Sequence, residues 1–85
     1  MIVETVRIWK DDTSEEFEAK TAFFMKDVFN VEEYVYPDVF KNDHPKSFVH
    51  IKEIGSIIVL EDFETLKIKW AAFNKHGWLN HIVTQ

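Results

Sequence analysis

Residues 13–29 read TSEEFEAKTAFFMKDVF, and this pattern predicts the first of two helices. Thr13 followed three residues later by Glu16 forms a capping box, the pairing that satisfies the first free amides of a helix. At about 100° per residue, one apolar stripe is expected, made of Phe17, Thr21, Phe24 and Val28. Asn30 follows, a residue type that ends helices in a left-handed turn. We therefore expect a helix from Thr13 to about Phe29.

Residues 62–78 predict a second helix by the same kind of argument. Asp62 is a suitable cap, and apolar residues recur at spacings of three and four, at Phe63, Leu66, Trp70 and Phe73. Gly77 is placed to end this helix, with Trp78 packing back on Phe73. The competing interpretation makes residues 65–70 a strand, because apolar and lysine side chains alternate there.

The remaining segments read as strands. Alternation and β-branched residues predict them at residues 2–10, 31–36, 47–53, 57–60 and 79–83. The continuous apolar run of 57–60 is typical of a central strand. The order β-α-β-β-(β)-α-β predicts an α+β fold, a ferredoxin-like two-layer sandwich with two helices on one face of a mostly antiparallel sheet. At 85 residues the chain is expected to form a single domain, 1–85.

Composition excludes several classes of protein. Hydrophobic residues make up 46% and charged residues 29%, the balance of a soluble globular chain. The absence of cysteine excludes disulfide scaffolds, thiolate metal sites and cysteine nucleophiles. Only two glycines occur, which argues against phosphate-binding loops. The longest aliphatic run, 57–60, is too short to span a membrane, and residues 1–12 do not resemble a secretory signal. We expect a cytoplasmic protein without cofactor or metal.

Charge is divided unevenly along the chain. Residues 1–40 hold ten acidic and four basic side chains, a net charge of −6, whereas residues 41–85 carry +1. Such a balance repels nucleic acid and attracts a basic protein surface. The candidate acidic contacts are Glu15, Glu16, Glu32 and Glu33. The alternative is that these acids cap helices and keep loops solvated.

An aromatic sheet face is the main functional indication. If Val6, Ile8 and Val49 face the helices, alternation leaves the far face with Arg7, Trp9, Tyr34, Tyr36, Phe48 and His50. Aromatic rings mixed with arginine are enriched in protein interfaces. Three interpretations remain open: a protein–protein or homodimer interface, a platform that stacks single-stranded bases, or ordinary core covered by residues 37–46.

Catalytic motifs are weak. Ser14 and Ser56 are assigned to a cap and a turn, while Ser47 has only His50 close in sequence. We predict a non-catalytic protein-binding module, an inhibitor or regulator of a nucleic-acid-handling protein. In composition alone the chain is similar to the short acidic inhibitors of phages and mobile elements. The alternatives are a small dimeric ferredoxin-like enzyme or small-ligand binder using His50 or His81, and a binder of single-stranded RNA or DNA.

Overall fold

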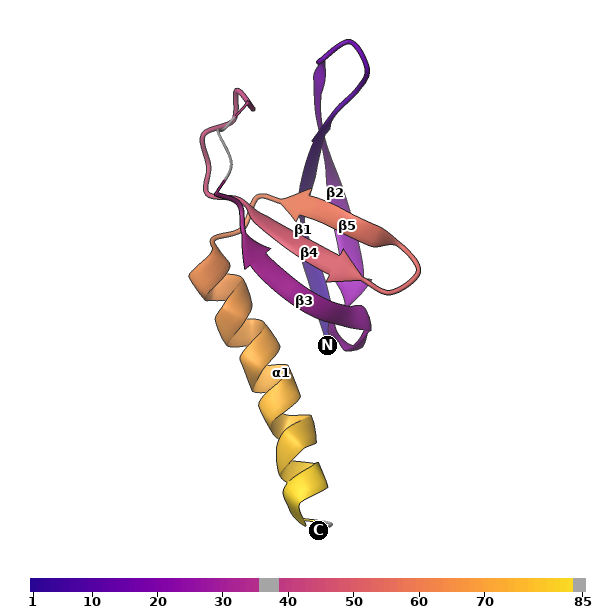
Figure 1. Cartoon of the computed structure of the whole chain (residues 1–85), viewed down its shortest axis with the longest axis vertical. Helices are drawn as coiled ribbons and strands as arrows, with labels where there is room; N and C mark the ends of the chain where they lie inside the picture. The colour runs from indigo at the N-terminus through magenta and orange to yellow at the C-terminus, as the bar shows by residue number, and fades with distance from the viewer. Residues whose placement is uncertain (36–38, 84–85) are drawn as a thin grey trace.

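A computed structural model describes residues 1–35 and 39–83, and the side chains of residues 1–35 and 39–73. The described elements are β1 (Ile2–Lys10), β2 (Glu16–Phe24), the 3-10 turn η1 (Met25–Asp27), β3 (Val28–Glu33), β4 (Ser47–Ile51), β5 (Gly55–Val59) and α1 (Phe63–Val83). The strands form one antiparallel sheet in the order β2-β1-β5-β4-β3, and α1 packs beside it (Figure 1).

The ferredoxin-like prediction is wrong, because residues 13–29 do not form a helix. They contain all of β2 and η1 and the first two residues of β3, and α1 is the one α-helix among the described residues. β1 and β2 form a hairpin with nine directly opposed pairs, from Ile2 opposite Phe24 to Lys10 opposite Glu16. Pairing along the whole length of both strands outweighs the helical spacing that residues 13–29 also contain.

In place of the predicted capping box, the hairpin loop contains a set of hydrogen bonds to the Asp11 carboxylate, here called the clasp. Oδ1 of Asp11 accepts hydrogen bonds from the Thr13 amide (2.9 Å), the Thr13 hydroxyl (2.7 Å) and the Glu15 amide (2.9 Å). Ser14 completes the turn in the left-handed region, at φ 64°. The Thr13 hydroxyl, followed by the Glu15 amide, lowers the pKa of Asp11 below its ordinary value of 3.8.

Helix α1 begins where the sequence predicts it and ends later. The Asp62 carboxylate accepts from the Thr65 amide at 3.3 Å, which confirms the predicted cap. The helix continues through Gly77 to Val83, so the predicted end and the strand at 79–83 are both wrong. One glycine costs a helix interior about 1 kcal/mol, which does not by itself end the helix. Within the described ranges, no helix is both long enough and apolar enough to cross a membrane.

The other strands lie close to their predicted positions. β3 occupies 28–33 where 31–36 was predicted, and β4 occupies 47–51 where 47–53 was predicted. The central position of the apolar run at 57–60 is confirmed, since β5 is third of the five strands. The turn that precedes it is at 52–54, with Glu53 left-handed at φ 66° and Gly55 at φ 101°.

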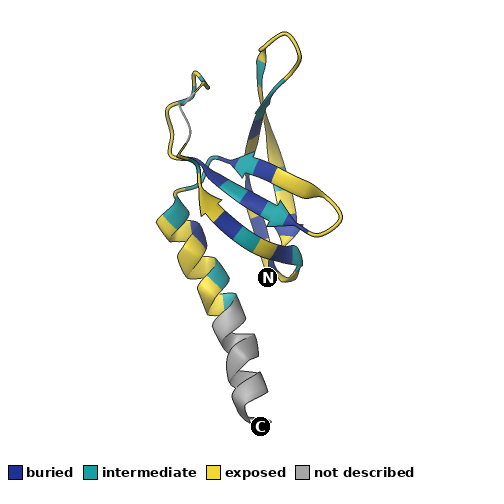
Figure 2. Ribbon diagram, viewed as in Figure 1, coloured by how far each residue is buried: buried dark blue, intermediate teal, exposed yellow. Residues whose placement is uncertain are grey.

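The main core lies between the sheet and α1. Its buried members are Val3, Phe23, Met25, Val28, Val31, Val49, Ile51, Ile57, Val59 and Leu66. Phe63, Trp70 and Phe73 of α1 are half-buried against this cluster, and the Trp70 indole donates to the Val28 carbonyl at 3.4 Å. Figure 2 shows burial concentrated at the sheet centre and exposure at the end of the β1–β2 hairpin.

A second buried site lies on the opposite side of the sheet. Ile8 is 1% exposed but is not part of the main core. Its cross-strand partner Glu18 accepts a hydrogen bond from the Asn42 side chain, and Glu16 accepts from the Lys41 and Asn42 amides. The segment 39–46 is therefore fastened over the face that carries Ile8, which accounts for the burial of that side chain.

Lys46 stabilises the conformation of segment 39–46. The residue is 5% exposed, and its ammonium donates to the carbonyls of Asn42 and His44. It also lies 5.6 Å from the centre of the Phe40 ring. Hydrogen bonds to two carbonyls and contact with a ring face help to satisfy the charge of a buried ammonium. The segment thus docks as an ordered unit.

Candidate functional site

The sheet face turned away from α1 and the main core, here called the outer face, carries the candidate site. Direct pairing places residues of three neighbouring strands together on this face: Asn30 and Glu32 of β3, Phe48 and His50 of β4, and Ser56 and Ile58 of β5. Ile8 of β1 pairs with Ile58 and joins the same face. The core residues of β3, β4 and β5 alternate with these and point the other way.

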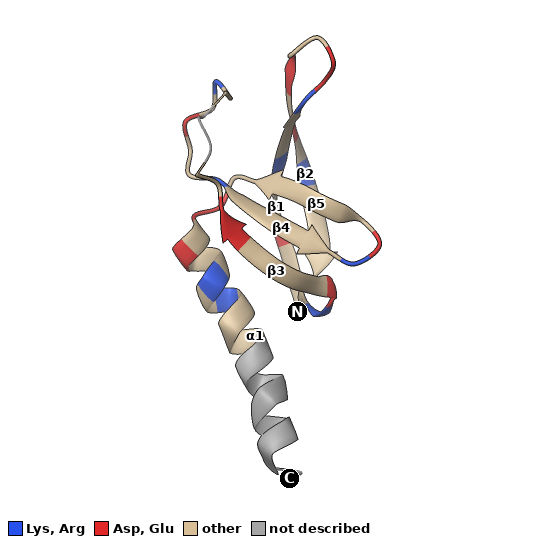
Figure 3. Cartoon of the chain, viewed as in Figure 1, with Lys and Arg blue, Asp and Glu red and all other residues tan. Residues whose placement is uncertain are grey.

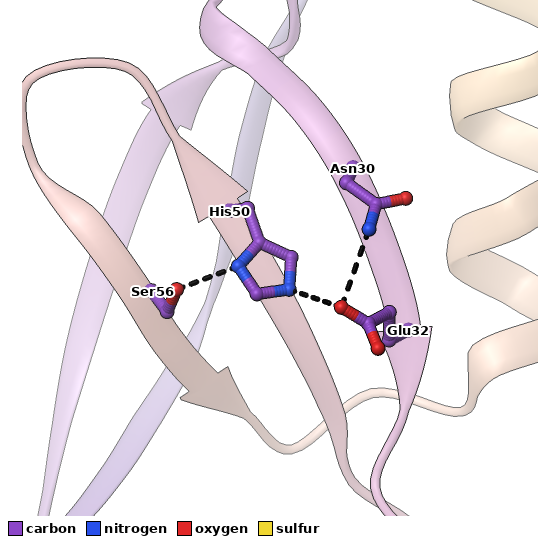
Figure 4. A network of polar contacts seen from close by, with 4 residues as sticks. All are labelled: Asn30, Glu32, His50 and Ser56. Atoms are coloured by element: carbon purple, nitrogen blue, oxygen red, sulfur yellow. Dashed lines mark hydrogen bonds and ion pairs between the residues drawn. The ribbon is translucent and has the colours of Figure 1, made fainter.

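His50 is the centre of a polar network on the outer face (Figure 4). Its Nε2 is 2.6 Å from Oε1 of Glu32, and its Nδ1 is 2.6 Å from the hydroxyl of Ser56. The Asn30 amide nitrogen donates to the same Glu32 oxygen at 3.2 Å. Both ring nitrogens of the imidazole are therefore engaged, which fixes the orientation of the ring.

A row of aromatic rings runs along the same face. Neighbouring ring centres are 5.3–6.2 Å apart in the sequence Phe29, His50, Phe48, Tyr34 and Phe40. Phe29 joins this row because the pairing of β3 with β4 is irregular between Val28 and Asn30, the signature of a β-bulge. The extra residue allows Val28 and Val31 both to reach the core while Phe29 reaches His50 on the other side.

The outer-face site is open at one end and covered at the other. Phe29 is 59% exposed, and the Glu32 side chain is 56% exposed. Tyr34, Phe40 and Phe48 are half-buried where segment 39–46 docks. The accessible part of the site is therefore Phe29 with the Glu32–His50–Ser56 network.

The structure brings together only some of the predicted contacts. The outer face gathers four of them, Glu32, Tyr34, Phe48 and His50. Arg7 lies on the other face, because it is paired with the core residue Val59, and Trp9 follows it by alternation. Glu33 is paired with Ser47 and so also lies on the core side. Glu15 and Glu16 are at the hairpin end, and Tyr36 lies outside the described residues.

Arg7 and Trp9 form a separate stack on the projecting hairpin. The Trp9 ring is stacked on Phe17 of β2, with ring centres 5.8 Å apart and an interplanar angle of 21°. The Arg7 guanidinium carbon lies 5.2 Å from the Trp9 ring centre. This cation–π and aromatic pairing stabilises the part of the hairpin that extends past the sheet.

Sequence reasoning missed Ser56, Asn30 and Phe29 as members of the site. Ser56 was assigned to a turn, but it is in β5 directly opposite His50. Only the pairing of the three strands brings these residues together. One local signal was present: the apolar run Val28–Phe29 cannot place both side chains in one core of a regular strand.

The connectivity Ser56–His50–Glu32 is that of a nucleophile, a base and an orienting acid. Such a site also needs donors to a developing oxyanion and a place for substrate. Hollows of about 550 and 150 Å³ occur on the β1–β2 hairpin, and neither is lined by a residue of the network. Among the side chains that the structure describes, no group of histidines and acids is placed to hold a metal ion.

Comparison with known proteins gives no match, whether to a family model, a curated protein or a solved structure.

Proposed function

We propose that this chain is a protein-binding module that uses the open end of the outer face. The observation that supports this most directly is Phe29, an exposed ring set by the β-bulge beside the Glu32–His50–Ser56 network. An exposed aromatic anchor next to oriented polar groups is the composition of an interface hot spot. The network is held in place before binding, which lowers the entropic cost of association.

Charge favours a partner with a basic surface. The formal net charge is −5, and acidic residues gather at the hairpin end, at the end of β3 and at the start of α1 (Figure 3). Glu32 is one of these acidic residues and is also part of the proposed binding site. Complementary potentials accelerate encounter and select the partner. Proteins that handle nucleic acid carry basic grooves, so we propose inhibition or regulation of such a protein.

The test compares two phenylalanines of similar exposure. The tagged chain is incubated with lysate of its native host as wild type, as Phe29→Ala and as Phe24→Ala, a matched control because Phe24 is 51% exposed on β2. We expect a stoichiometric partner with a basic surface that Phe24→Ala retains and Phe29→Ala loses. Its retention should fall as salt rises. Equal capture by both variants would contradict the proposed site.

A hydrolytic function is the second candidate, favoured only by the Ser56–His50–Glu32 contacts. It predicts acetylation of Ser56 by an activated ester such as p-nitrophenyl acetate, detected by intact mass, with loss of the adduct in Ser56→Ala. Binding of a single-stranded oligonucleotide that Phe29→Ala weakens would instead indicate base stacking. Neither result is expected if the outer face binds protein.

A further inference from the structure

Strand β2 leaves a long edge of the sheet open. It is an outermost strand, bonded to β1 along residues 16–24 on one side. Across the described ranges, no hydrogen bond from another element reaches the main chain of these nine residues on the other side. The outer part of the hairpin projects beyond the rest of the sheet, so this edge is accessible (Figure 1).

The residues whose main-chain groups face the open edge follow from the pairing. The Asp11 amide donates to the Glu15 carbonyl, and the Leu60 amide donates to the Val6 carbonyl. Odd residues of β1 therefore bond toward β2, and even residues bond toward β5. The hairpin register pairs odd residues of β1 with odd residues of β2, so the odd residues of β2 bond to β1. Amides and carbonyls are left facing outward at Glu16, Glu18, Lys20, Ala22 and Phe24.

An open edge of this length is a template for another strand, which natural sheets block with proline, bulges, short edges or charged side chains. β2 contains no proline, and its register with β1 is uninterrupted. Its outward positions instead carry a charge pattern, Glu16, Glu18 and Lys20. Charged side chains disfavour pairing in registers that oppose like charges, and they favour a register that sets opposite charges against each other.

We propose that the open edge of β2 pairs antiparallel with β2 of a second copy, about a two-fold axis at Ala19. This register sets Glu18 of each copy opposite Lys20 of the other, so two opposite-charge pairs form. Centring on Lys20 would oppose two ammonium groups, and centring on Thr21 would set Glu18 opposite Phe24. Charge complementarity therefore selects both the partner and the register.

The dimer leaves the outer-face site free and covers part of the exposed hairpin. Phe17, which is 37% exposed, meets Thr21 of the second copy on the same face as the Arg7–Trp9 stack. Asn42 already donates to one oxygen of Glu18 at 3.2 Å, which holds that carboxylate in place for pairing. Each dimer then presents two copies of the binding site at the two ends of a continuous sheet.

Because the chain contains no cysteine, one introduced thiol tests the register. At the axis, Ala19 faces its own equivalent in a non-hydrogen-bonded pair, where Cα atoms are about 4.5 Å apart, within the reach of a disulfide. Under mild oxidation Ala19→Cys should give a covalent dimer. Ala22→Cys is the matched control: its two copies are six residues out of register, about 20 Å apart. Equal or slower cross-linking of Ala19→Cys would overturn the proposed register.

A charge swap tests the pairing without any covalent trap. Lys20→Glu sets carboxylates opposite each other at both pairs and should raise the dimer dissociation constant about tenfold, measured by sedimentation velocity. The double variant Glu18→Lys, Lys20→Glu restores complementarity and should recover dimerisation. Lys69→Glu, on the exposed surface of α1, controls for net charge, and urea unfolding checks that each variant folds. A wild-type chain that remains monomeric at about 1 mM would overturn the proposal.

Discussion

Truncation of Leu66 tests whether α1 is fastened to the sheet as the structure places it. Leu66 is 1% exposed and, of the α1 side chains that the structure describes, it is the one buried in the main core. Leu66→Ala removes three buried carbons, worth about 0.8 kcal/mol each in transfer free energy, and leaves a cavity whose lining loses contacts. We expect the free energy of unfolding to fall by about 3 to 4 kcal/mol, a large share of the stability of so small a domain.

The measurement is urea unfolding followed by tryptophan fluorescence. With a slope of about 1 to 1.5 kcal/mol per molar urea for a chain of this size, the midpoint should fall by about 2 to 4 M. Ile68→Ala on the same helix is the control, because Ile68 is 65% exposed and its loss should cost less than about 0.5 kcal/mol. If the two variants differed by less than about 1 kcal/mol, the helix would not be docked through Leu66 and the described core would be refuted.

Three further predictions concern other parts of the fold. Ile8→Ala should cost about 2 to 4 kcal/mol by urea unfolding although Ile8 faces away from α1; a cost near zero would mean that segment 39–46 does not cover it. Gly55→Ala should cost about 1 to 2 kcal/mol in the same assay through backbone strain alone, because φ is 101° and no atom lies within 4 Å of an added Cβ; an unchanged midpoint would contradict that conformation. Because the pKa of Asp11 is lowered, its contribution to the stability of the fold is complete above pH 3.8 and is lost as the pH falls through the lowered pKa. An NMR titration should show the signals of the Asp11 carboxyl and the Thr13 amide shifting together below pH 3.8. A titration midpoint at or above pH 3.8 would argue against the clasp.

The sequence was informative where local chemistry determines structure. The start of α1 was predictable because Asp62 caps it within three residues, and the central strand because residues 57–60 are continuously apolar. Residues 13–29 were not predictable in this way. Phe17 and Thr21 are four residues apart. That spacing is close to one turn of a helix and is also two periods of a strand, so it fits both a helical stripe and a strand face. The choice depends on pairing with β1, which local patterns do not report.

The candidate site was partly predictable for the same reason. Phe48 and His50 were placed on one face by alternation within a single strand, and the structure places them together. Trp9 was placed with them, but the bonding of β1 to β5 turns Ile8 to the outer face instead. Alternation divides the residues of one strand between two faces. It does not tell which residues of the neighbouring strand lie on the same face, because that depends on the pairing register. Ser56 and Phe29 required the sheet register and the β-bulge.

The bulge in β3 separates the residues that pack in the interior from the residue that is exposed on the outer face. Val28 and Val31 satisfy the packing of the interior, while the intervening Phe29 faces solvent on the other side. Substitution at position 29 should therefore alter the proposed binding surface with little effect on the interior. Under the proposed function, a change of this one side chain would alter the choice of partner while the architecture stays the same, a freedom that a regular alternation of residues would not provide.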